Sequence, residues 1–178
     1  MVKEYSAPKE CTILFFRIMS RESLATELKD LLRERQWTLS VAESCTGGLV
    51  GGAITDIAGS SNYFRGGIIA YDNEVKISFL GVPREIIEKH GAVSSMTVVA
   101  MARGAQRVFN TDCAIATSGI AGPDGGTKEK PVGLVYVGIA VGEMFRSYEY
   151  RFTGDRNAVR NATVDEALRR LVEIVKQR

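Results

Sequence analysis

Histidine is nearly missing from this sequence, since His90 is the only one in 178 residues. A catalytic Ser-His-Asp arrangement would depend on it entirely, yet residues 88–91 are typical of an exposed helix end, where a histidine interacts with the last carbonyls. A metal site built from several histidines is excluded, and the carboxylates show no ligand spacing. We therefore expect no metal and no other cofactor.

Cysteines are also few, and the net charge is small. The three cysteines, Cys11, Cys45 and Cys113, share no close spacing, which argues against a disulfide framework or a zinc site and favours a reducing cytoplasm. The net charge is only +2, and basic residues are interleaved with acidic ones without forming a basic stripe. Nucleic acid is therefore not an expected partner.

No apolar run is long enough for a membrane. Arg17 interrupts the apolar residues 11–16, whereas a membrane-spanning helix needs about 20 apolar residues and a signal peptide needs a longer apolar stretch. We expect residues 1–19 to be an extension that packs on the domain or on a partner subunit. Residues 20–178 are enough for one domain with its own hydrophobic core.

Helical and extended patterns alternate along the chain. We expect helices at 20–36, 46–57, 73–80, 83–89 and 97–109, and a long C-terminal helix capped by Thr153 or Asp155. We expect strands at 39–43, 66–71, 113–117, 132–141 and 145–152, the last two joined by a tight hairpin at 142–143. This alternation predicts a single layered α/β domain with a mixed β-sheet covered by helices.

Residues 42–48 place two hydroxyls and a thiol where a predicted strand ends and two glycines begin a helix. Unpaired N–H groups at a helix start suit a nucleophile and its oxyanion. Ser44 or Thr46 could instead cap a helix starting near Gly47, and residue preferences favour that interpretation. Cys45 would need a lowered pKa to react, and thiols that simply pack in the core are commoner.

A lysine can replace histidine as a base when burial or a nearby positive charge neutralises it. Lys76 follows a predicted buried strand by a few residues, and Tyr71 at the strand end could relay a proton or hold the lysine. The alternative is an ordinary solvated lysine on a short helix.

A second glycine-rich segment, residues 118–126, could cradle a phosphate or form a long structural turn. It matches neither the Walker nor the Rossmann pattern. Arg156, at the start of the last helix, could bind phosphate or carboxylate with two parallel hydrogen bonds. Arg65 and Arg160 are less well placed for that role, and surface exposure is the default for any arginine.

In combination, these segments resemble the CinA C-terminal domain family, whose stand-alone members are nicotinamide mononucleotide amidohydrolases. The matching segments run in order, at residues 42–48, 64–67, 70–71, 73–76, 91–94, 119–123, 130–133 and 154–156. The family usually has threonine before the Gly-Ile-Ala-Gly-Pro run, and Ser118 retains the hydroxyl there.

The resemblance implies a hydrolase that converts nicotinamide mononucleotide to nicotinate mononucleotide and ammonia without a metal. By analogy, Ser44 is the nucleophile, Lys76 its base and Tyr71 an assistant in proton transfer, with oxyanion donors near Thr46 and Gly47. The implied substrate-binding residues are Thr46, Gly47, Gly48, Ser118, Gly119, Gly122 and Arg156.

Two alternatives stay open at this point. The same loops would suffice for a non-catalytic pyridine-nucleotide binding module, and a Cys45-dependent amidase is a weaker possibility. We expect a small-molecule nucleotide as the ligand, no nucleic acid, no membrane, and a homodimer, which the glycine-rich faces and the apolar N-terminal segment favour.

Overall fold

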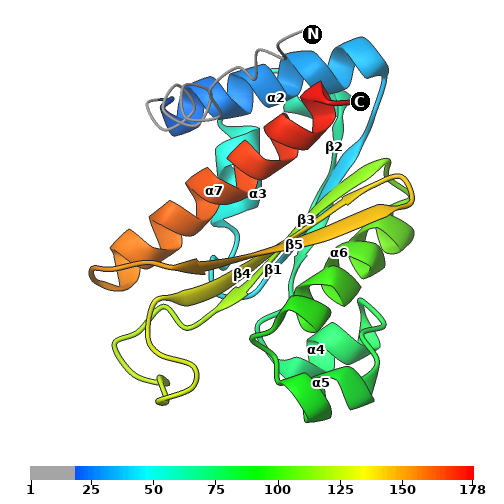
Figure 1. The fold of residues 1–178 in the computed structure, drawn as a ribbon. Helices are drawn as coiled ribbons and strands as arrows, with labels where there is room; N and C mark the ends of the chain where they lie inside the picture. Colours follow the sequence, from blue (N-terminus) through cyan, green and yellow to red (C-terminus); the bar gives the residue numbers. More distant parts are fainter. Residues whose placement is uncertain (1–18) are drawn as a thin grey trace, which may run out of the picture.

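A computed structural model describes residues 19–178 as a five-stranded sheet between two layers of helices (Figure 1). The sheet runs β2-β1-β3-β4-β5, with β1 parallel to both β2 and β3, and with β4 and β5 antiparallel to their neighbours. The strands are β1 Leu39–Glu43, β2 Phe64–Ile69, β3 Cys113–Gly119, β4 Leu134–Val141 and β5 Met144–Arg151. The predicted single α/β domain with a mixed sheet is confirmed.

The helices divide between the two faces of the sheet (Figure 1). One face carries α2 Arg21–Arg35, α3 Leu49–Thr55 and α7 Arg156–Lys176; the other carries α4 Asn73–Ser78, α5 Arg84–His90 and α6 Ser95–Phe109. A 3-10 turn, Ser60–Asn62, precedes β2. None of the helices between residues 19 and 178 combines the length and apolar character that crossing a membrane requires.

The two faces of the sheet differ in side-chain size because successive residues of a strand point to opposite faces. Towards α2 and α7 the central strands present large apolar residues, such as Ile115 and Ile139. Towards α6 they present small ones, such as Ala114 and Ala116. At Gly138 a Cβ would overlap the carbonyl oxygen of Val98 in α6. Small residues on this face therefore allow α6 to lie against the sheet.

Several element boundaries differ from the predicted ones. The helix expected from Thr46 begins at Leu49, because residues 44–48 form a turn. Strand β3 extends to Gly119, two residues beyond the prediction. The C-terminal helix is capped by Asp155, whose carboxylate accepts the Ala158 N–H. Of the predicted extension 1–19, only Met19 lies within the described residues, where it packs against the core.

Two helical glycines offer a test of this packing. A Cβ at Gly104 in α6 would overlap the carbonyl oxygen of Leu80, whereas a Cβ at Gly52 in α3 would meet no atom within 4 Å. We expect Gly104→Ala to lower the free energy of unfolding by about 1–3 kcal/mol through overpacking. Gly52→Ala should raise it by about 0.5–1 kcal/mol through helix propensity. Urea unfolding of both variants checks this, and a stabilised Gly104→Ala would contradict the close approach.

Candidate active site

The candidate site lies at the carboxyl ends of the three parallel strands. Glu43, the last residue of β1, is aligned with Ile69 in β2 and with Thr117 in β3. The chain leaves β1 towards β2 through α3 on one face and reaches β3 through α6 on the other face. The C-terminal end of β1 is therefore a switch point of the topology, where open α/β sheets bind their ligands.

Ser44 is the first residue after β1 and is held through its backbone. Its N–H donates to the carbonyl of Thr117 over 3.0 Å, and its own carbonyl accepts the Gly47 N–H over 3.2 Å. The residue is only 9% exposed, yet its Oγ keeps some contact with solvent and has no hydrogen-bond partner within residues 19–178. The Ser44 hydroxyl is thus held at the sheet edge without a structural bond of its own.

The start of α3 is capped by Glu43 and not by a hydroxyl. The N-cap position is Gly48, at φ +100°, and no side chain at that position bonds the helix. Instead the buried Glu43 carboxylate accepts the N–H groups of Gly48, Val50 and Gly51 over 2.8–3.1 Å. The interpretation of Ser44 or Thr46 as helix cap is therefore wrong.

Removing this carboxylate is expected to destabilise the domain. Glu43→Ala would leave three N–H groups without their acceptor, and we expect the free energy of unfolding to fall by about 2–4 kcal/mol. Asp155→Ala provides the comparison, because that cap accepts a single N–H and should cost about 1 kcal/mol. Urea unfolding measures both, and equal losses would contradict the triple acceptor role of Glu43.

The turn after Ser44 leaves one backbone N–H, that of Thr46, without a partner among the described residues, because the Cys45 N–H donates to the thiol of its own residue. The Gly47 N–H is bonded to the Ser44 carbonyl and the Gly48 N–H to Glu43, so neither is free for an oxyanion in this geometry. Within the described part of the chain, the N–H groups of Cys45 and Thr46 bond to no other residue. The buried Thr46 hydroxyl bonds Thr117 Oγ1 over 2.7 Å, which ties the turn to β3.

Lys76 in α4 is buried, with 1% of the residue exposed. Its Nζ donates to the backbone carbonyl of Tyr71 over 3.1 Å, and no carboxylate of residues 19–178 forms an ion pair with it. Burial lowers the pKa of the Lys76 ammonium from its ordinary value of 10.5, and the negative charge of Asp72 opposes part of that shift. The alternative of a solvated lysine is wrong.

Arg156 joins two of the predicted site loops. Its Nη1 donates to the carbonyl of Gly122 over 2.8 Å, and its Nη2 donates to the hydroxyl of Tyr71 over 3.2 Å. Gly122 has φ +80° and precedes a cis bond to Pro123. Tyr71 is 61% exposed and its hydroxyl bonds Arg156, so it is the Tyr71 backbone that contacts the lysine.

Ser118 and Gly119 belong to β3, and the glycine-rich loop begins after them. The buried Ser118 hydroxyl donates to the carbonyl of Ala92 over 2.7 Å. Lys130 Nζ donates to the carbonyls of His90 and Val93 over 2.7 and 2.8 Å. Both side chains therefore hold the connection between α5 and α6 beside β3.

The remaining candidates are not suited to the reaction, two by their position and one by its chemistry. His90 is exposed at the end of α5, and Arg65 lies near the amino end of β2. Burial raises the pKa of the Cys45 thiol to about 12, which disfavours a Cys45 nucleophile. Among the residues the structure describes, no group of three or more His, Cys, Asp or Glu side chains could hold a metal ion.

Sequence reasoning misses two contacts that shape the site. From the sequence alone, Glu43 is identified only as part of a motif. A carboxylate at the end of a buried strand, shortly before two glycines, could have suggested a cap for the helix that follows them. Arg160 follows Arg156 by one helical turn, so both lie on one side of α7. Its Nε donates to the Cys45 carbonyl over 3.1 Å, and its Nη2 to the Thr46 carbonyl over 2.7 Å.

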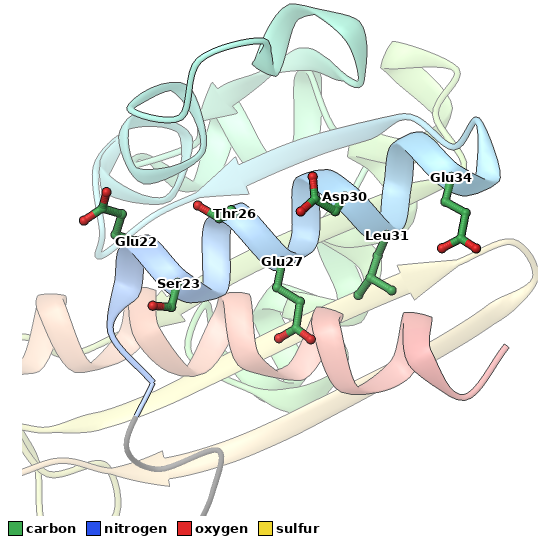
Figure 2. Close-up of a pocket in the computed structure, with 7 residues that line it drawn as sticks. All are labelled: Glu22, Ser23, Thr26, Glu27, Asp30, Leu31 and Glu34. Atoms are coloured by element: carbon green, nitrogen blue, oxygen red, sulfur yellow. The ribbon is translucent and has the colours of Figure 1, made fainter.

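Two of the hollows in the structure differ in their relation to the site. A small one of about 180 Å³ lies between α3 and β2 and is lined in part by Glu43 and Gly48. A wider, open one of about 750 Å³ runs along α2 and is lined mainly by acidic and polar side chains (Figure 2). None of the α2 residues belongs to the loops that follow the parallel strands, so the second hollow is separate from the site.

Comparison with known proteins identifies relatives over nearly the whole described domain. The family model described as CinA C-terminal domain matches residues 21–175. A CinA-like protein of Dictyoglomus thermophilum is 49% identical over 146 residues, which cover 82% of this chain and 36% of that protein. A CinA-like protein of a Nostoc species is 46% identical over 171 residues, covering 90% of this chain and 40% of its own length. The chain thus spans well under half of these curated relatives.

Solved structures match almost end to end. The competence/damage inducible protein CihA of Agrobacterium tumefaciens has a TM-score of 0.84 and 40% identity, covering 88% of this chain and 99% of its own. A CinA superfamily protein of Enterobacter cloacae has a TM-score of 0.86 and 27% identity, with 98% of both chains covered. The fold described above is therefore shared with experimentally determined structures.

Proposed function

The chain belongs to the CinA C-terminal domain family, and we propose that it hydrolyses the carboxamide of nicotinamide mononucleotide, releasing nicotinate mononucleotide and ammonia. The observation that carries this proposal is the buried Lys76, whose pKa is lowered and whose Nζ donates to the backbone carbonyl of Tyr71 just beyond the end of β2. The Ser44 hydroxyl, which has no hydrogen-bond partner within residues 19–178, follows the aligned end of β1. A lysine that gives up its proton more easily than usual is suited to activate a serine in the absence of a histidine.

The proposed reaction has two half-reactions. Ser44 Oγ attacks the carboxamide carbon while Lys76 Nζ takes the hydroxyl proton, and the resulting oxyanion is bound by backbone N–H groups. The tetrahedral intermediate expels ammonia, which receives the proton from Lys76, and an acyl-serine remains. Water then attacks the acyl carbon as Lys76 takes one of its protons. Release of the acid returns the proton to Ser44.

The substrate-binding part of the proposal rests on Arg156 and the loop at Gly122. Arg156 is exposed and bridges this loop to Tyr71, and it has further N–H donors beyond the two in use. A guanidinium in this position is suited to the phosphate of a mononucleotide. The glycines of the loop permit close approach of its backbone to the ligand.

The test is ammonia release from nicotinamide mononucleotide by the wild-type chain, with EDTA present and with nicotinate mononucleotide quantified by chromatography. We expect the two products in equal amounts. The matched substrate is nicotinamide riboside, which lacks the phosphate and should have a higher KM. Saturable binding without any product would overturn the proposal in favour of the pyridine-nucleotide binding module. Inactivation by thiol alkylation that Cys45→Ala prevents would point to Cys45.

We also carry the predicted homodimer forward as a proposal. Three large apolar side chains at and beyond the end of the edge strand, Ile69, Tyr71 and Phe79, are each more than half exposed. Exposed apolar side chains of this kind suit a contact with a second copy. Sedimentation velocity at several concentrations tests this, and a single monomeric species at all of them would exclude it.

A further inference from the structure

Arg160 is the charged side chain that contacts the turn after Ser44 most directly. Its guanidinium donates to two consecutive carbonyls, those of Cys45 and Thr46, from the second turn of α7. We propose that Arg160 is a positioning residue that aims the Thr46 N–H at the oxyanion of the reaction. This inference rests on the proposed amidase function. It gives Arg160 a role in orienting an oxyanion donor, which is separate from the proposed role of Arg156 in binding the substrate.

The argument follows from the geometry of the peptide bond. In a trans peptide, the C=O of one residue and the N–H of the next point in opposite directions. Because the Cys45 carbonyl points to Arg160, the Thr46 N–H points away from α7. The Thr46 carbonyl also points to Arg160, and the Gly47 N–H accordingly points back to the Ser44 carbonyl. Arg160 thus determines the direction of the Thr46 N–H. Of the two N–H groups in these peptides, it is the one without a partner in the described residues.

The same contact also strengthens that donor. A hydrogen bond from a charged group polarises the peptide it binds, and polarisation of the carbonyl makes the attached N–H a better donor. Cys45 is 5% exposed and Thr46 is fully buried, so water screens the charge of the guanidinium only weakly at these peptides. The Thr46–Thr117 hydroxyl pair and the Glu43 carboxylate hold the turn from its other sides. The N–H is therefore pre-oriented before substrate binds.

The two arginines of α7 have separable roles. Arg156 contacts Gly122 and Tyr71, where the mononucleotide would bind, and its loss should raise KM. Within residues 19–178 the hydrogen bonds of Arg160 all go to the turn that carries the nucleophile, so its loss should lower kcat and leave KM unchanged. A donor aimed at charge that develops only in the transition state acts on kcat in this way.

The experiment measures ammonia release by the wild type, Arg160→Met, Arg160→Lys and a control, Arg170→Met. Arg170 lies on the same helix and bonds Tyr150 and Glu173, and in the described part of the chain none of its hydrogen bonds goes to the turn. We expect Arg160→Met to lower kcat roughly 10- to 100-fold with KM within about twofold of the wild type. Arg160→Lys should be intermediate, because an ammonium lacks the planar fork of a guanidinium. Arg170→Met should lose stability but keep its kcat.

Added guanidinium ion separates positioning from a general structural effect. A further pair of variants, Arg160→Ala and Arg170→Ala, is assayed with added guanidinium, which should restore part of the lost kcat in Arg160→Ala and change nothing in Arg170→Ala. The inference is overturned if Arg160→Met keeps its kcat or changes only KM. If that variant does not fold, an unchanged kcat in Arg160→Lys overturns it. A wild type that releases no ammonia refutes the proposed function itself, and the inference with it.

Discussion

Replacing Ser44 with alanine is expected to lower ammonia release from nicotinamide mononucleotide by at least about 1,000-fold, because no acyl intermediate can form. The Ser44 hydroxyl makes no hydrogen bond within residues 19–178, so its loss breaks no bond that the fold uses. The free energy of unfolding should therefore change by less than about 1 kcal/mol. Steady-state assays and urea unfolding of the same preparation measure both quantities.

The neighbouring thiol provides the matched control for this experiment. Cys45 is buried and its thiol pKa is raised to about 12, so Cys45→Ala should retain most of the activity. Iodoacetamide should likewise leave the wild-type rate unchanged. Normal turnover by Ser44→Ala would remove serine from the mechanism. Loss of activity in Cys45→Ala, with Ser44 intact, would transfer the role to the thiol.

Replacing Lys76 with methionine is expected to have opposite effects on activity and on stability. The general base is lost, and the rate should fall about 100- to 10,000-fold. The free energy of unfolding at pH 7 should rise, because a buried ammonium is replaced by an apolar side chain of similar length. A loss of activity together with a gain of stability is typical when a catalytic residue in unfavourable surroundings is replaced. A destabilised Lys76→Met with normal activity would contradict both parts.

The pH dependence of stability follows from the lowered pKa of Lys76. The pKa in the folded state lies below 10.5, the ordinary value that the unfolded chain retains. Between these two values the unfolded state binds more protons, so folding becomes less favourable as pH falls through this window. At every pH below the folded pKa, the loss of unfolding free energy caused by Lys76 has the same value. That value is about 1.4 kcal/mol for each pKa unit between the folded and the unfolded pKa.

Activity should follow the neutral form of the same amine. The rate should rise with pH through the folded pKa of Lys76 and reach a plateau below pH 10.5. A pH profile of kcat/KM measures this for the free enzyme. A rate that stays flat into mildly acidic solution would exclude lysine as the base. Comparing the unfolding free energies of the wild type and Lys76→Met across the same pH range should show the difference shrinking towards alkaline pH.

The fold was largely predictable because its signals are local. Apolar periodicity located the three long helices and the last strand, and the hairpin at 142–143 was confirmed by the pairing of β4 with β5. The start of α3 was not predictable from local preferences. Glu43 supplies the cap from within the strand, which depends on a left-handed Gly48 and a buried carboxylate.

The site was predictable only as a set of segments. Aligned parallel strands explain why Ser44, Tyr71 and Ser118 reach one edge of the sheet. The burial of Lys76 depends on how α4 packs, which its short sequence does not encode. The contact of Arg160 with Cys45 joins residues 115 positions apart. No local pattern reports such a contact, and a surface role was the better expectation from composition alone.

Helix α7 also limits how the length of this chain could vary over evolutionary time. Arg156 and Arg160 bond different segments from a single helix, and residues such as Val159 and Val164 pack that helix against the core. One inserted residue between the two arginines would rotate everything beyond it by about 100° and advance it by about 1.5 Å. Arg160 would then leave the turn, and the core contacts would lose their register. We therefore expect the spacing of these two residues to tolerate neither insertion nor deletion.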